Sequence, residues 1–182
     1  MKKVILVTGS VRSGKSSYAV NLAKATKAKV SFLATCQPQD AEMKKRVKKH
    51  KNSRPKSWKT IEEPIEISKV ISKLKINEVL IIDCLTLWIS NLLLSGLTEK
   101  EILKNIKEFV TVLKESKASI IIVSNEVGWG IVPDNKLARI FRDIIGTAHQ
   151  IIAKVSDEVY LMIAGIPVRI VEGKESENAK YK

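Results

Sequence analysis

The segment VILVTGSVRSGKSS, residues 4–17, is the strongest indication of the fold of this chain. It opens with a short continuous apolar run, Val4–Thr8, whose β-branched residues predict a strand buried on both faces. It leads into residues 16–27, whose apolar positions form one stripe of a helix. The turn between them has the spacing G-x-x-x-x-G-K-[ST]. A glycine-rich turn between a buried strand and a helix predicts a loop that binds nucleotide phosphates.

Each residue type in this turn suits phosphate chemistry. Gly9 and Gly14 allow backbone N–H groups to turn inward around the phosphates, and the start of the helix adds partial positive charge. Lys15 can reach the β- and γ-phosphates, and the Ser16 hydroxyl can hold Mg²⁺. The alternative is a chance match in an ordinary turn, and the flanking strand and helix argue against it.

An acidic residue at the end of a neighbouring strand would complete such a site. Asp83 ends the buried run VLIID, residues 79–83, and is expected to hold Mg²⁺ directly or through water. The same position is equally compatible with an aspartate that caps the helix that follows. The position by itself leaves both roles open.

The rest of the chain alternates apolar runs with amphipathic segments. This alternation predicts an α/β fold, a P-loop NTPase-like three-layer domain with a mostly parallel central sheet and a C-terminal antiparallel strand pair. A single catalytic domain is expected over residues 1–172, followed by a polar tail at residues 173–182. Further strands are predicted at 29–35, 78–84, 119–125, 158–165 and 166–171, further helices at 40–51, 65–74, 99–116 and 134–155, and 85–97 is an unusually apolar segment.

The composition narrows the range of partners. A net charge of +13 favours anionic ligands such as nucleotide phosphates, nucleic acid or membrane headgroups. Aromatic residues make up 5% of the chain, too few for the stacking surface of a single-strand binder. Cys36 and Cys84 fit no metal or disulfide spacing, and no segment approaches a membrane span. We therefore expect a cytoplasmic protein with no stable membrane insertion and no nucleic-acid partner.

The basic stretch MKKRVKKHKNSRPKSW, residues 43–58, holds a histidine among cationic side chains. If the segment is helical, Arg46, His50 and Arg54 lie at successive i, i+4 positions on one face, and Pro55 should end the helix by about Arg54. Arginine binds phosphate in a bidentate manner, and a neutral imidazole can attack phosphorus. The alternative is a solvated basic face with a bystander histidine.

Five blocks of the sequence together resemble one enzyme family, the bifunctional adenosylcobinamide kinase/adenosylcobinamide-phosphate guanylyltransferases of cobalamin biosynthesis. The resemblance runs from Lys3 to about Val171, and the blocks occur in the family's order. The blocks are TGSVRSGKSSYA, FLATCQPQDAEMKKRVKKHKNSRPKSWKTIEEP, IIDCLTLWISNLL, VSNEVGWGIVPDNKLARIFRDIIG and DEVYLMIAGIPV.

The resemblance implies two catalytic residues and a set of nucleotide contacts. His50 matches the histidine that takes GMP from GTP as a covalent intermediate, and Lys15 belongs to the matching phosphate loop. Ser16 and Asp83 are implied to hold Mg²⁺ through the nucleotide. The implied nucleotide-binding residues are Gly9, Ser10, Val11, Arg12, Ser13, Gly14, Lys15, Ser16, Ala34, Thr35, Cys36, Lys51, Asn52, Ser53, Arg54, Glu62 and Asp83.

The resemblance also implies the reactions and partners. A nucleoside triphosphate, ATP or GTP, phosphorylates adenosylcobinamide. GMP then passes from GTP through His50 to adenosylcobinamide phosphate and gives adenosylcobinamide-GDP. The family is trimeric, which implies a homotrimer. Trp88 and Trp129 are the candidates for contact with the corrinoid, although Trp88 is better explained by packing in the core or between subunits.

Two residues depart from the family's pattern. His149 stands where an asparagine is expected, and Trp129 stands where a smaller apolar residue is usual. We expect His149 to be a helix-face residue with no role.

Two other functions remain compatible with a phosphate loop. One is a single-activity small-molecule kinase in which His50 is a surface residue. The other is a nucleic-acid-stimulated ATPase that uses residues 43–58 as a basic surface for binding the nucleic acid.

Overall fold

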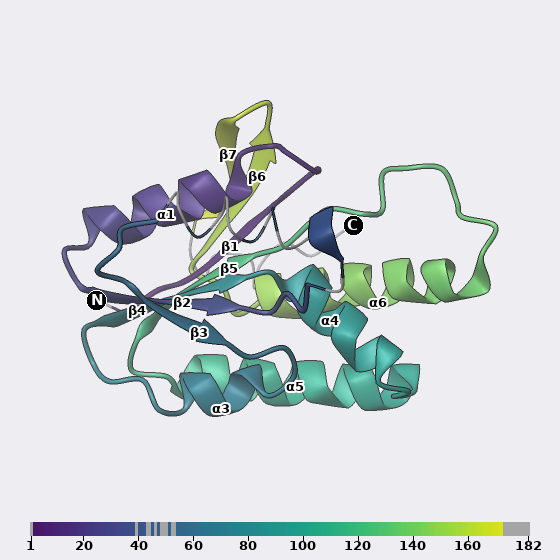
Figure 1. The fold of residues 1–182 in the computed structure, drawn as a ribbon, viewed down its shortest axis with the longest axis horizontal. Coiled ribbons are helices and arrows are strands. Elements are labelled where there is room, and N and C mark those ends of the chain that lie inside the picture. Colours follow the sequence, from purple (N-terminus) through teal and green to yellow (C-terminus); the bar gives the residue numbers. More distant parts are fainter. Residues whose placement is uncertain are drawn as a thin grey trace, which may run out of the picture.

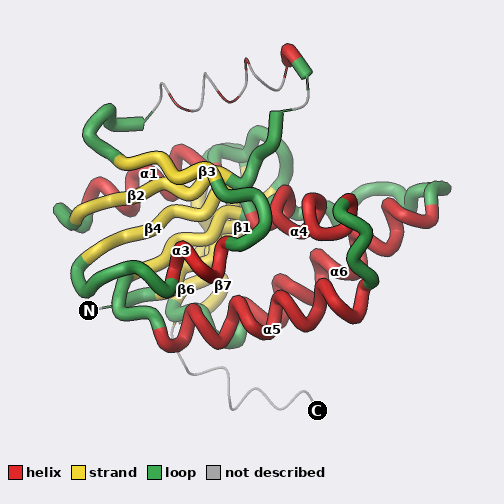
Figure 2. The backbone as a smooth tube through the Cα atoms, turned by 60° about the horizontal axis from the view of Figure 1, so that its bottom comes forward, coloured by secondary structure: helices red, strands yellow, loops and turns green. Residues whose placement is uncertain are grey.

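A computed structural model describes residues 2–38, 40–42, 45, 47, 51 and 54–172. Its centre is a seven-stranded sheet in the order β3-β2-β4-β5-β1-β6-β7, in which every neighbouring pair is parallel except β6 and β7. The strands run side by side in Figure 2. Their bounds are β1 Val4–Gly9, β2 Lys29–Ala34, β3 Lys59–Glu62, β4 Glu78–Asp83, β5 Ser119–Val123, β6 Glu158–Ile163 and β7 Ile166–Glu172.

Helices cover both faces of this sheet, with α1 on one face and the other helices on the opposite face (Figure 1). The strand residues alternate accordingly: Val4 and Leu6 pack against α3–α6, whereas Ile5 and Val7 pack against α1. This arrangement confirms the predicted three-layer α/β domain with an antiparallel C-terminal pair. The helices are α1 Lys15–Ala25, α3 Ile67–Ile71, α4 Leu85–Leu94, α5 Glu99–Glu115 and α6 Lys136–Ala153.

Two elements were not anticipated from the sequence. The edge strand β3 has only four residues and none of them is buried, so it carries no alternation that would reveal it. The apolar segment at 85–97 contains α4, whose buried residues include Leu85, Trp88 and Leu92. Its sequence is apolar at most positions, which hides the usual helical stripe, and it packs against α5 and α6.

The predicted helix at residues 40–51 falls partly outside the described residues, and so do Arg46 and His50. Of the described positions there, 41, 42, 45, 47 and 51 have helical backbone. Arg54 lies in a bend, and its N–H donates to the Lys51 carbonyl at 3.4 Å. Arg54 is thus not part of a helical face with Arg46 and His50, in agreement with the expectation that Pro55 ends the helix by about Arg54.

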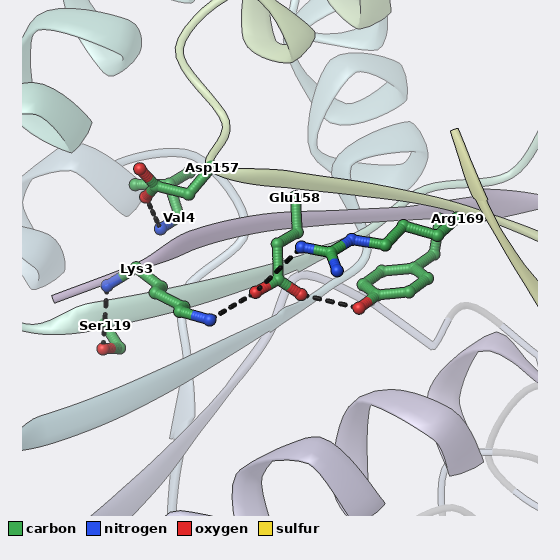
Figure 3. Close-up of polar contacts among 7 residues, drawn as sticks. Lys3, Val4, Ser119, Asp157, Glu158 and Arg169 are labelled. Carbon is green, nitrogen blue, oxygen red and sulfur yellow. Dashed lines mark hydrogen bonds and ion pairs between the residues drawn. The ribbon is translucent and has the colours of Figure 1, made fainter. Parts of the chain in front are cut away.

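The far end of the sheet, where β1 and β6 begin, is held by a cluster of charges (Figure 3). Glu158 accepts hydrogen bonds from Lys3 Nζ at 2.5 Å and from the Tyr160 hydroxyl at 2.6 Å, and Arg169 lies 3.7 Å away. Asp157 accepts the Val4 N–H at 2.7 Å. No helix among the described residues is long and apolar enough to cross a membrane.

Candidate functional site

The loops that follow β1, β2, β4 and β5 meet at one edge of the sheet, because parallel strands place their carboxyl ends together. Backbone hydrogen bonds join these loops directly. Thr35 N–H donates to the Asp83 carbonyl at 3.3 Å, and Glu126 N–H donates to the Gly9 carbonyl at 2.8 Å. Predicted site residues from three separate parts of the chain are therefore gathered at this edge.

The phosphate loop has the backbone that its glycines predict. Gly9 has φ +146° and Gly14 has φ +94°, and both values favour glycine. A Cβ atom at Gly9 would lie 2.5 Å from the Met162 carbonyl oxygen. The turn between β6 and β7 supports the loop from outside, since Gly165 N–H donates to the Ser13 carbonyl at 3.1 Å. The loop is thus held by β6 as well as by its own sequence.

Lys15 lies inside this loop and is 6% exposed. Its ammonium group donates to the Ser10 carbonyl at 2.5 Å and to Ser13 Oγ at 3.4 Å, and both acceptors are neutral. Burial lowers the pKa of Lys15, and electrostatic interactions with Cys84 and Asp83 partly offset this effect. A nearly buried cation whose hydrogen bonds end on neutral atoms is suited to an anionic ligand, so the loop fits nucleotide phosphates.

Asp83 ends β4 and is partly exposed at this edge. The next helix, α4, has Cys84 as its N-cap residue and no side-chain capping bond. The alternative role for Asp83, a cap of that helix, is therefore wrong. Among the described residues no group of three or more His, Cys, Asp or Glu side chains could hold a metal ion. Ser16 and Asp83 suit Mg²⁺ that also takes phosphate oxygens from a nucleotide.

The predicted contacts after β2 are tied to the end of β4. Thr35 is fully buried, and its hydroxyl donates to the Cys84 carbonyl and accepts from the Cys84 N–H, each at 2.8 Å. Asn91 of α4 donates to the Thr35 carbonyl at 2.8 Å. The Thr35 side chain thus holds the site together. Burial and the charge of Asp83 raise the pKa of the neighbouring Cys36 thiol.

The described part of the basic stretch lies against the same edge. The Arg54 guanidinium carbon sits 3.2 Å above the centre of the Phe32 ring of β2. Burial lowers the pKa of Arg54, and the charge of Asp83 acts in the opposite direction. Lys51 Nζ is 3.9 Å from Glu62, the last residue of β3. The structure therefore brings Lys51, Arg54, Glu62 and Asp83 to one side of the sheet, while His50, Asn52 and Ser53 lie outside the described residues.

Sequence reasoning missed a polar group beside the phosphate loop. His149 of α6 was expected to have no role, yet its Nε2 is 2.7 Å from Ser124 Oγ and its Nδ1 is 3.5 Å from Glu126 Oε2. Only 14% of the His149 side chain is exposed, and burial lowers its pKa although Glu126 acts in the opposite direction. The only sign of these contacts in the sequence was that His149 stands where the family pattern has an asparagine.

The two tryptophans that were candidates for corrinoid contact differ in exposure. Trp88 is 1% exposed, its Nε1 donates to the Ile65 carbonyl at 2.7 Å, and its ring lies against Phe109. Core packing therefore explains Trp88, as expected. Trp129 is 70% exposed in the loop that follows β5, beside Ile131, which is 96% exposed.

The sequence matches a family model and several related proteins. A model of the family described as cobinamide kinase / cobinamide phosphate guanyltransferase matches residues 5–170. The chain is 39% identical over 165 residues to the bifunctional adenosylcobalamin biosynthesis protein CobP of Pseudomonas aeruginosa, covering 90% of this chain and 94% of that protein. It is 36% identical over 180 residues to the bifunctional adenosylcobalamin biosynthesis protein CobU of Escherichia coli, covering 92% of this chain and 99% of that protein.

Solved structures resemble the fold at much lower sequence identity. An ATPase from a type III secretion system has a TM-score of 0.54 and 12% identity, over 97% of this chain and 58% of that chain. The ATP synthase subunit NeqB from Nanoarcheaum equitans has a TM-score of 0.55 and 11% identity, over 99% of this chain and 53% of that chain. This chain thus spans little more than half of either structure. The likeness confirms the predicted P-loop NTPase-like fold and shows the fold alone.

Proposed function

Because the chain belongs to the cobinamide kinase / cobinamide phosphate guanyltransferase family, we propose that it phosphorylates adenosylcobinamide and then converts the product into adenosylcobinamide-GDP. The family membership confirms the resemblance drawn from the five sequence blocks. Fold and family both imply nucleotide binding. The observation that carries the proposal is the phosphate loop, in which Lys15 is nearly buried and interacts electrostatically with Asp83.

The first reaction transfers the γ-phosphoryl group of ATP or GTP to the hydroxyl of adenosylcobinamide. Loop N–H groups between Gly9 and Ser16 would hold the phosphates, and the ammonium group of Lys15 would stabilise charge on the transferring group. Ser16 and Asp83 would hold Mg²⁺, which when bound neutralises charge on the phosphate oxygens. The desolvated position of Lys15 strengthens its electrostatic effect.

The second reaction transfers GMP from GTP. In our proposal His50 attacks the α-phosphorus, pyrophosphate leaves, and adenosylcobinamide phosphate then attacks the histidine-bound GMP. Lys51, Asn52, Ser53, Arg54 and Glu62 are proposed nucleotide contacts in this step. The positions of Arg54 over Phe32 and of Lys51 near Glu62 support this proposal, since they put both ends of that contact segment at the edge that holds the phosphate loop.

Incubation with GTP labelled at the α-phosphate, followed by denaturation, tests the covalent step. We expect label on the protein as an acid-labile, alkali-stable phosphoramidate. His50→Ala should abolish the label and leave nucleotide binding largely intact. Lys45→Ala is the matched control, because Lys45 is exposed in the same segment and is not a proposed contact. Equal labelling of the His50 variant would contradict the nucleophile assignment.

The same experiment separates the two other functions. A single-activity kinase would phosphorylate adenosylcobinamide and give no covalent nucleotide. A nucleic-acid-stimulated ATPase would bind DNA or RNA in a salt-sensitive manner and hydrolyse nucleotide faster in its presence. Transfer of label to adenosylcobinamide phosphate, with GTP preferred over ATP, is the result that our proposal requires.

The remaining parts of the proposal concern partners and location. The exposed side chains Trp129 and Ile131 are the candidate apolar surface for the corrinoid, since Trp88 is buried. A homotrimer in the cytoplasm is proposed from the family resemblance, and light scattering on the purified protein would measure its mass in solution.

If Trp129 contacts the corrinoid, Trp129→Ala should raise the KM for adenosylcobinamide without changing the affinity for nucleotide.

A further inference from the structure

The segment that follows β5 lies between the phosphate loop and the end of β4. Ser124 N–H donates to the Val7 carbonyl at 2.9 Å, and Glu126 N–H donates to the Gly9 carbonyl at 2.8 Å. On the other side, the N–H and Nδ2 of Asn125 donate to the hydroxyl of Thr86 at 3.1 and 3.2 Å. Glu126 is therefore fixed beside the first residue of the loop that holds the phosphates.

The carboxylate of Glu126 is held at both oxygens. Oε1 accepts the Gly128 N–H at 2.8 Å, and Oε2 lies 3.5 Å from His149 Nδ1. The other nitrogen of His149 is 2.7 Å from the hydroxyl of Ser124, which is fully buried. Because 19% of the Glu126 side chain remains exposed, a ligand at the edge of the sheet can still reach the carboxylate.

The state of His149 follows from these contacts. Burial lowers its pKa, although the charge of Glu126 and its hydrogen bond act in the opposite direction, so the ring is neutral at neutral pH. A neutral ring that accepts the Ser124 O–H at Nε2 carries its proton on Nδ1, where it faces Glu126. The Glu126 carboxylate, which only accepts hydrogen bonds, thus favours the tautomer with the proton on Nδ1, and His149 in turn orients the carboxylate.

Phosphoryl transfer to an alcohol requires a group that receives the hydroxyl proton, and kinases use a carboxylate for this purpose. Three other carboxylates near this edge are less suitable. Asp83 is the proposed Mg²⁺ contact, and Glu63 directly follows the edge strand β3. Glu62 is at the end of β3, which is separated from β1 by three strands. Glu126 follows β5, the immediate neighbour of β1.

We propose that Glu126 is the catalytic base of the phosphorylation step and that His149 is its positioning residue, an inference that rests on the kinase activity proposed above. A Glu126 oxygen takes the proton from the acceptor hydroxyl while the hydroxyl oxygen forms its bond to the γ-phosphorus. The bond from the γ-phosphorus to the bridging oxygen breaks, and that oxygen keeps the electron pair and leaves on the nucleoside diphosphate.

Steady-state phosphorylation of adenosylcobinamide by the full chain tests the role of Glu126. Glu126→Gln keeps the size of the side chain and one acceptor oxygen, but it replaces the other oxygen by an NH₂ group and removes the basicity. It should lower kcat by about 10²–10⁴-fold. The KM for nucleotide and the labelling by GTP should stay as in the wild type. Glu108→Gln, an exposed glutamate of α5 paired with Lys104, is the control and should leave kcat unchanged.

The outcomes separate the inference from the function on which it rests. A wild-type protein that phosphorylates no adenosylcobinamide overturns both. A wild-type kinase activity that Glu126→Gln retains within about threefold overturns the inference alone, since a base contributes far more. If Glu126→Gln also lowers the melting temperature, Glu126→Asp decides. A phosphorylation rate of Glu126→Asp well above that of Glu126→Gln supports Glu126 as the base. An equal loss of rate in both variants overturns that role.

Two variants test the positioning role of His149. His149→Ala should lower the kcat of phosphorylation by about tenfold through a misplaced carboxylate, with the nucleotide KM unchanged. His149→Asn supplies an amide N–H that can face Glu126 and should recover most of this loss. Equal losses in the Ala and Asn variants, or a change in nucleotide KM alone, would overturn the positioning role.

Discussion

At the scale of single residues, Gly9 links the sheet to the phosphate loop. Its φ of +146° is a value that side chains rarely allow, and an added Cβ would also lie 2.9 Å from Ser13 Oγ. Its carbonyl accepts the Glu126 N–H, so the same residue connects the loop to the segment that follows β5. A change at this position should therefore disturb both phosphate binding and the neighbouring loop.

We predict that Gly9→Ala lowers the free energy of unfolding by about 2 kcal/mol or more, because the backbone or Met162 must move. It should also remove the rise in melting temperature that GTP produces in the wild type. Thermal unfolding with and without GTP measures both effects. Gly146→Ala in α6 is the control. Nothing lies within 4 Å of its added Cβ, so it should gain about 0.5–1 kcal/mol. If Gly9→Ala is as stable as the wild type, the expected backbone strain at this position is absent and the prediction is wrong.

At the scale of elements, the charge cluster at Glu158 joins the beginnings of β1 and β6 to β7. Glu158 and Tyr160 share one face of β6, and Arg169 of β7 pairs with Tyr160 across the antiparallel ladder. Lys3 precedes β1, which pairs with β6 through Ile5 and Glu158. Figure 3 shows Glu158 between Lys3 and Arg169. The cluster therefore fixes β6, whose far end supports the phosphate loop.

Glu158→Gln should lower the free energy of unfolding at pH 7 by about 1–3 kcal/mol, because hydrogen bonds to a buried charge are lost. Burial by itself raises the pKa of Glu158, but the contacts with Lys3, Tyr160 and Arg169 outweigh it and hold the pKa below its usual value. The stabilisation is thus present above the pKa of the unfolded chain and is lost as the pH falls through the lower folded pKa.

Urea unfolding of wild type and variant between pH 7 and pH 3 measures this difference, which should shrink toward the acidic end. Glu108→Gln removes an exposed i, i+4 pair and is the matched control, with an expected change below about 0.5 kcal/mol. A difference between wild type and Glu158→Gln that stays constant over this pH range would show that the charge of Glu158 is not the source of the stabilisation.

At the scale of the whole molecule, two apolar cores lie on the two faces of one sheet. The larger core joins α3–α6 and includes Trp88, whereas the smaller joins α1 and includes Cys84. Burial, together with the charge of Asp83, raises the pKa of the Cys84 thiol to about 11. Because Cys84 is 5% exposed at the end of β4, a reagent should reach it only when the sheet opens.

The reactivity of Cys84 should therefore report unfolding of the domain as a whole. In a Cys36→Ser variant we expect no reaction of the remaining thiol with a disulfide reagent at pH 8 under native conditions, and one equivalent in denaturant. The native rate should rise with denaturant in parallel with global unfolding. Rapid, complete labelling of the native protein would contradict this prediction and would indicate local opening at Cys84.

The domain class and the phosphate loop could both be predicted from the order of the residues alone. Buried parallel strands are read as continuous apolar runs, and the run from Val4 to Thr8 followed by the glycine spacing predicted both the strand and the loop. The family, and with it the proposed reactions, also followed from sequence blocks. These features are local, because each depends on residues that are close together in the chain.

The side chains that meet across the edge of the sheet could not be predicted without the three-dimensional fold. The role of Asp83 as a helix cap was excluded by α4, Trp88 was assigned to the core, and Trp129 to the surface. His149 is 23 residues beyond Glu126 in sequence numbering, and packing of α6 against the sheet brings their side chains to 3.5 Å. No local pattern encodes such a contact, since it depends on the strand order and on the face that each helix covers.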